Sequence, residues 1–164
     1  MIAEQNSIYE TEHEDFRKTV RTFLEREAVP HTEEWEKAGV VDRDLWTKAG
    51  EAGLLGFEIP EEYDGLGVKD FRYNLVVTEE CARLGLTGPG FALHNDVTTP
   101  YFVNLCNDEQ KQRWLPGMVS GELITAIAMT EPGAGSDLQG IRTTAVDKGD
   151  HYVLNGSKTF ITNG

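Results

Sequence analysis

Cysteine, basic residues and long apolar runs are all scarce in this sequence of 164 residues. Its two cysteines, Cys81 and Cys106, lie in apolar helical patterns, so we expect buried free thiols and no metal site. Lysine and arginine number 15 against 28 acidic residues, a net charge of −13, which argues against nucleic acid as the main partner. No apolar run approaches the ~18 residues that a membrane span needs.

Targeting patterns are also missing from the N-terminal stretch MIAEQNSIYETEHED. It is acidic, and it has neither the basic-then-apolar pattern of a secretory leader nor the arginine-rich composition of an organelle-import segment. We therefore expect a cytoplasmic protein, or a mature chain that has already been processed.

Two kinds of pattern divide the chain. Residues 10–120 carry helical periodicity and helix caps, whereas residues 123–164 alternate and are rich in turns. We predict an α+β fold, with an all-α helical domain over 1–122 followed by the first strands of a mostly antiparallel β-domain over 123–164. Because about four short strands would leave open edges and little core, we expect the chain to stop inside that β-domain.

The expected helices begin at polar caps and end at glycine or proline. Glu79 and Glu80 are expected on the polar side of the fourth helix, and residues 53–67 are expected to form a loop. The predicted helices are Thr11 to Pro30, a short one around Trp35 ending near Gly39, Asp42 to Gly53, one capped by Asp70, 87–105 with a kink at Pro100, and Asn107 to Gly121 with a break at Pro116.

The β-region is expected to begin with a strand at LITAIAM (123–129). Two hairpin turns are predicted after it, one at Asp147–Asp150 and one at Asn155-Gly156. Strands of about six residues fit between these turns.

The segment AMTEPGAGSDLQGIRT (128–143) concentrates glycine and hydroxyl residues directly after the expected strand. Glycine lets a backbone approach a ligand closely, and free N–H groups and hydroxyls hold phosphate or a polar ring edge. Leu138 stands where a dinucleotide fingerprint needs its third glycine, and no Gly-Lys-Ser/Thr follows. On the residues alone, an ordinary β-turn and a ligand-holding loop both stay open.

Two motifs in order, MTEPGAGSD (129–137) and NGSKTFITNG (155–164), resemble those of the acyl-CoA dehydrogenase family. GLLGFEIPEEYDGLG, TGPGFALHND and NDEQKQRWLPGMVSGE are also similar to family segments, so the resemblance covers about residues 12–164. TGPGFALHND and GSDLQGIRT lean toward the long-chain subgroup.

The resemblance implies a helical domain, a middle β-domain and a C-terminal helical bundle, with FAD between the last two. It implies formation of 2,3-enoyl-CoA from acyl-CoA in fatty-acid β-oxidation, by α-proton abstraction and β-hydride transfer to flavin N5. Electron-transfer flavoprotein would accept the electrons, and the complete protein would be a homotetramer.

Residue by residue, the resemblance implies two flavin-contacting segments. Main-chain groups near Met129 and Thr130 would face the pyrimidine edge of the flavin, Thr162 would approach N5 and O4, and Phe160, where relatives often have tryptophan, would cover a ring face. Ser136 would reach the pyrophosphate and lie near the CoA of the substrate. The cofactor-binding residues expected in this way are Ile127, Ala128, Met129, Thr130, Gly135, Ser136, Phe160, Ile161 and Thr162.

No catalytic residue is expected within this chain, because the family's base comes from a C-terminal part. Glu131 lies in the flavin-side loop and is rejected as that base, so the isolated chain is expected to be inactive. His94 and Tyr101 are expected either in an acyl cavity or in ordinary packing. Two alternatives stay open: an acyl-CoA oxidase or flavin monooxygenase-like relative, and a non-catalytic module that binds acyl-CoA or a partner.

Overall fold

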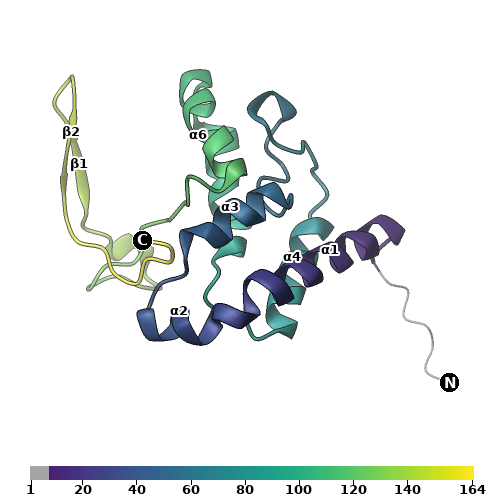
Figure 1. The fold of residues 1–164 in the computed structure, drawn as a ribbon. Helices are drawn as coiled ribbons and strands as arrows, with labels where there is room; N and C mark the ends of the chain where they lie inside the picture. Colours follow the sequence, from purple (N-terminus) through teal and green to yellow (C-terminus); the bar gives the residue numbers. More distant parts are fainter. Residues whose placement is uncertain (1–7) are drawn as a thin grey trace. The chain divides into compact units, whose positions relative to one another are not determined.

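The computed structural model describes residues 8–164 and divides into two compact units, one ending at Ile124 and the other spanning Thr125–Gly164 (Figure 1). The first seven residues, part of the stretch without a leader pattern, lie outside the described residues. Within residues 8–164, every helix is too short or too polar to span a bilayer.

The first unit consists of helices joined by short connections, as the periodicity predicted. A 3₁₀ turn, η1, precedes α2, another, η2, interrupts the loop after α3, and a π-helical turn, η3, precedes α5. The elements are α1 (Thr11–Glu27), η1 (Val29–His31), α2 (Thr32–Ala38), α3 (Arg43–Glu51), η2 (Glu61–Tyr63), α4 (Arg72–Arg83), η3 (Leu93–Thr98), α5 (Thr99–Leu105) and α6 (Asp108–Ser120).

The helices α1 and α4 pack against each other and contribute to the main hydrophobic core. Val20 and Leu24 of α1 and Val76 and Val77 of α4 are buried in it. The expected cap of α1 was off by one residue: the N-cap is Glu10, whose N–H donates to Nδ1 of His13 at 3.1 Å. The start of the helix at Thr11 was predicted correctly.

Glu80 contradicts the prediction of a polar helix side, whereas its neighbour Glu79 is exposed as expected. Glu80 is only 2% exposed and accepts hydrogen bonds from Arg21 of α1 and Arg83 of α4. A buried carboxylate needs such partners, and the sequence pattern of α4 alone does not reveal donors that a different helix supplies.

The long helix expected over 87–105 is distorted at η3 rather than kinked at Pro100, which lies in the first turn of α5. The hydroxyls of Thr98 and Thr99 both donate to the carbonyl of His94, at 2.9 and 2.7 Å. Such side-chain bonds compete with the regular backbone ladder of a helix. The buried Asn95 donates to the Leu54 carbonyl and accepts from Gly56 N–H, so η3 is tied to the loop after α3.

The helix α6 begins at its expected cap, where Asn107 and Gln110 exchange backbone-to-side-chain hydrogen bonds of 2.9 and 3.0 Å. The break expected at Pro116 is wrong, because α6 continues through this residue to Ser120. Packing accounts for the difference: Leu115 and Met118 on either side of the proline are buried. The free energy of that burial outweighs the loss of one backbone hydrogen bond.

The second unit contains one short 3₁₀ turn, η4 (Leu138–Gly140), and one antiparallel hairpin of β1 (Thr144–Asp147) and β2 (Tyr152–Asn155). The turn predicted at Asp147–Asp150 is confirmed, since Lys148 N–H donates to the His151 carbonyl and Gly149 N–H to Asp147 Oδ1. Both strands have four residues, fewer than the six expected.

Two further expectations for this unit are wrong. Residues 123–129 form no strand. Side chains donate to this stretch, Lys158 to the Met129 carbonyl and Asn163 to the Thr125 carbonyl, where a strand would have a regular backbone ladder. Asn155-Gly156 makes no hairpin turn in the described chain. Gly156 instead has a φ of 155° and passes so close to Thr143 that a Cβ there would lie 2.8 Å from the Thr143 Cα atom.

Candidate functional site

Two segments distant in sequence lie side by side within the second unit, residues 125–130 and residues 158–163. Thr159 N–H donates to the Thr130 carbonyl at 3.0 Å, and the Lys158 ammonium donates to the Met129 carbonyl at 2.9 Å. The Asn163 side chain donates to the Thr125 carbonyl at 3.2 Å. The structure thus brings Ile127, Ala128, Met129 and Thr130 together with Phe160, Ile161 and Thr162.

The expected site residues leave a surface of mixed chemistry on these segments. Phe160 is 91% exposed, Met129 is 40% exposed, and Ala128 and Thr162 are exposed as well. Ile127, Thr130 and Ile161 are partly buried. The exposed Phe160 ring and the adjoining exposed Met129 and Thr162 offer both apolar and polar groups, which are the kinds of contact that a flat, partly apolar ligand uses.

The backbone of Phe160 is also unusual, because its φ of 56° lies in the left-handed region. Few residues other than glycine adopt this left-handed region, and those that do often belong to ligand-binding sites. The conformation is held without burial of the Phe160 ring.

Gly135 and Ser136 lie further along the loop, beyond a tight turn in which Glu131 and Ala134 exchange backbone hydrogen bonds of 2.9 and 3.1 Å. A Cβ added at Gly133 or Gly135 would meet no atom within 4 Å, and neither has a positive φ. Neither packing nor backbone geometry therefore demands glycine at these two positions. The space beside these two glycines is open, so a ligand such as a phosphate group can approach the backbone closely there.

Asp137 orients the end of this loop, because its Oδ1 accepts from Gln139 N–H at 3.2 Å at the start of η4. The adjacent Ser136 is exposed beside it. The loop thus offers an open hydroxyl next to an open glycine turn.

Glu131 is 8% exposed, and its carboxylate holds the two ends of the loop together through hydrogen bonds. It accepts from the N–H groups of Arg142 and Thr143, at 2.8 and 2.9 Å, and from the Lys158 ammonium at 2.9 Å. The Thr143 side chain, those backbone donors and Lys158 lower the pKa of Glu131 to about 2. A carboxylate held in this way is a poor proton acceptor, which agrees with its rejection as a catalytic base.

Comparison with known families matches both units. Residues 10–122 match the acyl-CoA dehydrogenase N-terminal domain, and residues 126–164 match the acyl-CoA dehydrogenase middle domain. The chain belongs to the acyl-CoA dehydrogenase family. The sequence motifs therefore identified the family correctly, and the α+β fold class is confirmed.

Relatives in this family are similar over nearly the whole chain. The long-chain specific acyl-CoA dehydrogenase of Sus scrofa mitochondria is 53% identical over 157 residues, which are 96% of this chain and 36% of that protein. An acyl-CoA dehydrogenase structure from Geobacillus kaustophilus is 53% identical, with a TM-score of 0.92 over 98% of this chain and 42% of that one. This chain thus spans little more than a third of such relatives' length.

A third relative is a structure of an acyl-CoA dehydrogenase from Bacillus anthracis complexed with FAD. It is 35% identical, with a TM-score of 0.78, and the match covers 97% of this chain and 28% of that one. The open glycine turn, the exposed hydroxyls and the uncovered Phe160 of the present chain fit a flavin dinucleotide, which combines a pyrophosphate with a flat ring.

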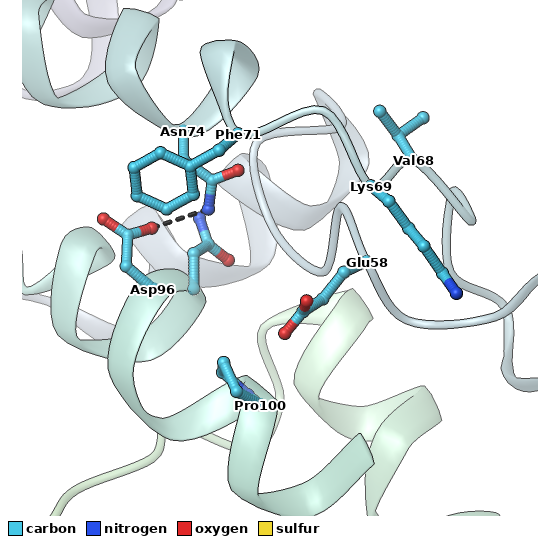
Figure 2. A pocket seen from close by; sticks show the side chains of 8 residues that line it. Glu58, Val68, Lys69, Phe71, Asn74, Asp96 and Pro100 are labelled. Atoms are coloured by element: carbon cyan, nitrogen blue, oxygen red, sulfur yellow. Dashed lines mark hydrogen bonds between the residues drawn. The ribbon is translucent and has the colours of Figure 1, made fainter. Parts of the chain in front are cut away.

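A pocket of the first unit, which the sequence did not suggest, lies between α4, η3 and the loop after α3 (Figure 2). Glu58 points into it, and Asp96 opposite accepts from the Asn74 amide at 2.6 Å. Burial raises the pKa of both carboxyl groups. With a volume of about 70 Å³ it is too small for an acyl-CoA molecule, since pockets for such ligands take ~300 Å³ or more.

Two further titratable candidates, His94 and His13, have structural roles. His94 is fully buried, with Nε2 3.1 Å from the Met118 carbonyl, whereas Tyr101 is 51% exposed. Glu10, Glu12 and His13 bring ligand atoms within 4.8 Å of one another. His13 nevertheless uses Nδ1 to accept from Glu10 N–H and Nε2 to reach Asp70 at 3.3 Å, so its ring serves the start of α1.

Proposed function

We propose that this chain provides the helical domain and the flavin-facing part of the middle domain of an FAD-dependent acyl-CoA dehydrogenase. The activity is the conversion of an acyl-CoA thioester to the 2,3-enoyl-CoA. When bound, FAD supplies the acceptor for the hydride that leaves the β-carbon. Similarity to long-chain specific enzymes supports a long-chain substrate and a place in fatty-acid oxidation.

The observation that carries the proposal is the alignment of residues 125–130 with residues 158–163, which exposes Met129, Phe160 and Thr162 on adjoining segments. Main-chain donors at Met129 and Thr130 would bind the pyrimidine edge of the ring, and the Thr162 hydroxyl the edge near N5. Ile127, Ala128 and Ile161 would support these contacts. Such donors stabilise the negative charge that develops on reduction.

The glycine turn supports the placement of the rest of the dinucleotide. Gly135 and Ser136 would bind the pyrophosphate, and Ser136 would also lie near the substrate's CoA. Phe160 would cover one face of the ring and exclude water from it. The α-proton needs a different group, because Glu131 is engaged with three donors, and we propose that the base lies outside these 164 residues.

Partners and compartment follow from the same assignment. We propose electron-transfer flavoprotein as the electron acceptor and a homotetramer as the assembled state. The location would be the cytoplasm in a bacterium or the mitochondrial matrix in a eukaryote. An acyl-CoA oxidase would instead pass its electrons to oxygen, and a non-catalytic module would bind acyl-CoA without turnover.

The pyrophosphate assignment is tested by Gly135→Val. A Cβ at position 135 would meet no protein atom within 4 Å, so we expect the unfolding temperature of the flavin-free protein to change little. FAD affinity should fall about tenfold or more, since the valine would occupy the space that the phosphate needs. Fluorescence titration of FAD into the full-length protein, after its own FAD has been removed, measures this affinity.

Lys148→Ala, in the exposed hairpin turn, is the matched control and should leave FAD affinity unchanged. Unaltered FAD affinity in a folded Gly135→Val protein would contradict the proposed pyrophosphate site. Turnover of acyl-CoA with an artificial electron acceptor, compared with oxygen uptake, separates the dehydrogenase from the oxidase. Absence of both activities in a flavin-loaded enzyme would favour the non-catalytic module.

A further inference from the structure

Lys158 and Glu131 form an ion pair that also joins the two proposed flavin-contacting segments. The Lys158 ammonium lies 2.9 Å from Glu131 Oε1 and 2.9 Å from the Met129 carbonyl oxygen. Glu131 is 8% exposed and the Lys158 side chain 22% exposed, so water screens the pair only partly. One cation thus contacts both the loop carboxylate and the backbone next to the proposed ring.

The bond to Met129 fixes the direction of one peptide group. A trans peptide points its carbonyl and its N–H to opposite sides, and the described chain contains no cis bond. Because the Met129 carbonyl faces Lys158, the N–H of Thr130 in the same peptide points away from residue 158. The next carbonyl, that of Thr130, is held in turn by Thr159 N–H at 3.0 Å.

Local geometry brings Lys158 to this position. After β2, the chain passes Thr143 at Gly156, where a Cβ would lie 2.2 Å from the Thr143 hydroxyl oxygen. Thr143 and Arg142 are the residues whose N–H groups hold Glu131. The close passage at Gly156 therefore places residues 157–159 beside the loop, where the Glu131 carboxylate and the Met129 carbonyl accept from Lys158.

We propose that Lys158 and Glu131 are positioning residues for the flavin: Lys158 orients the Met129–Thr130 peptide so that Thr130 N–H meets the pyrimidine edge, and Glu131 holds Lys158 in place. This inference rests on the proposed function. It also assigns opposite electrostatic effects to the two residues. The Lys158 cation favours the negative charge that the ring gains on reduction, and the Glu131 carboxylate opposes it.

The test compares Lys158→Met, Lys158→Arg and Glu131→Gln with Lys148→Met in the purified holoenzyme. Lys158→Met should weaken FAD binding about tenfold, as expected for one misdirected charge-assisted hydrogen bond, and should lower the flavin midpoint potential. Glu131→Gln should raise the midpoint potential. Lys158→Arg keeps the positive charge but changes the shape of the donor. Its flavin midpoint potential should therefore be close to that of the wild type, whereas its FAD affinity should stay lower than that of the wild type. Lys148→Met, at an exposed turn, should match the wild type in both.

Equal potentials and flavin spectra in the wild type, Lys158→Met and Glu131→Gln would overturn the proposal, even if unfolding temperatures fell. A Glu131→Gln protein that does not fold leaves the decision to the two Lys158 variants. Failure of Lys158→Met to fold would also overturn it, because the ion pair would then be a condition of folding. Absence of FAD from the wild type would instead refute the proposed function itself.

Discussion

Glu80 is a buried carboxylate at the contact between α1 and α4. Its carboxylate accepts from Arg21 Nε at 2.9 Å and from Arg83 Nε at 2.8 Å, and Arg17 lies 3.4 Å away. Arg21 and then Arg83 lower the pKa of Glu80 to about 2, against the effect of its burial. A single carboxylate therefore joins three guanidinium groups from two helices.

Glu80→Ala should lower the free energy of unfolding by about 2 kcal/mol, because it leaves three cations without their shared acceptor. Glu79→Ala is the matched control one residue away. Glu79 is half exposed and pairs with Arg17 at 2.7 Å, so its loss should cost less than ~1 kcal/mol. Urea denaturation of both variants measures the difference, and equal costs would show that burial of Glu80 carries no special weight.

At the scale of elements, the contact between α3 and α6 is unusually close. A Cβ at Gly50 would lie 2.5 Å from the Ser120 carbonyl oxygen, and one at Gly121 would lie 2.1 Å from the Trp46 carbonyl oxygen. Both obstacles are backbone atoms, which cannot turn aside as a side chain does. Glycine at these two positions lets the helices approach each other.

Gly50→Ala should therefore destabilise the protein by about 2 kcal/mol, although alanine is the better helix former. Glu51→Ala, at the exposed neighbouring position, should change stability by less than ~0.5 kcal/mol. Thermal unfolding followed by circular dichroism compares the two. A stabilised Gly50→Ala protein would mean that the helices move apart at little cost.

The elements that the sequence predicted well are those with local determinants. Asn107 and Gln110 form the cap of α6 within four residues, and Gly39 ends α2 with a φ of 70°. The mispredicted ones depend on distant partners. Pro116 stays helical because of packing, Glu80 is buried because of arginines on α1, and residues 123–129 lack a strand ladder.

The same distinction applies to the site. Motif resemblance indicated residues 127–136 and 160–162, and the structure brings 127–130 beside 160–162. The motif resemblance did not indicate Lys158. A signal was present in the sequence, because a lysine between two flavin-contacting stretches carries a charge that needs a partner. The resemblance also did not indicate Glu58 and Asp96, which share a pocket only after α4, η3 and a loop have packed together.

At the scale of the whole molecule, low pH should destabilise the folded state of both units. The pKa of Glu80 in the first unit and of Glu131 in the second is lowered from 4.5 to about 2. Each carboxylate therefore stabilises the folded state above pH 4.5, and this stabilisation is lost as the pH falls from there to about 2. Glu58 and Asp96, whose pKa is raised, gain protons at higher pH and partly offset the loss.

The expected result is a steep loss of stability below pH 4.5 that Glu80→Gln and Glu131→Gln each make shallower. Both substitutions remove the titrating carboxyl group and keep its shape. Unfolding temperatures recorded from pH 7 to pH 2 give the profile. A pH profile that is the same in the double variant and the wild type would assign acid sensitivity to other groups.

The π-helical turn η3 has a consequence for how this chain tolerates changes of length. One residue removed from Leu93–Thr98 would let the helix become regular, but each residue of an α-helix turns the chain by about 100°. Either Asn95 would leave the loop that it binds, or the side chains of α5 would face in new directions. Insertions and deletions should therefore be rare here, and common in the exposed turn between β1 and β2.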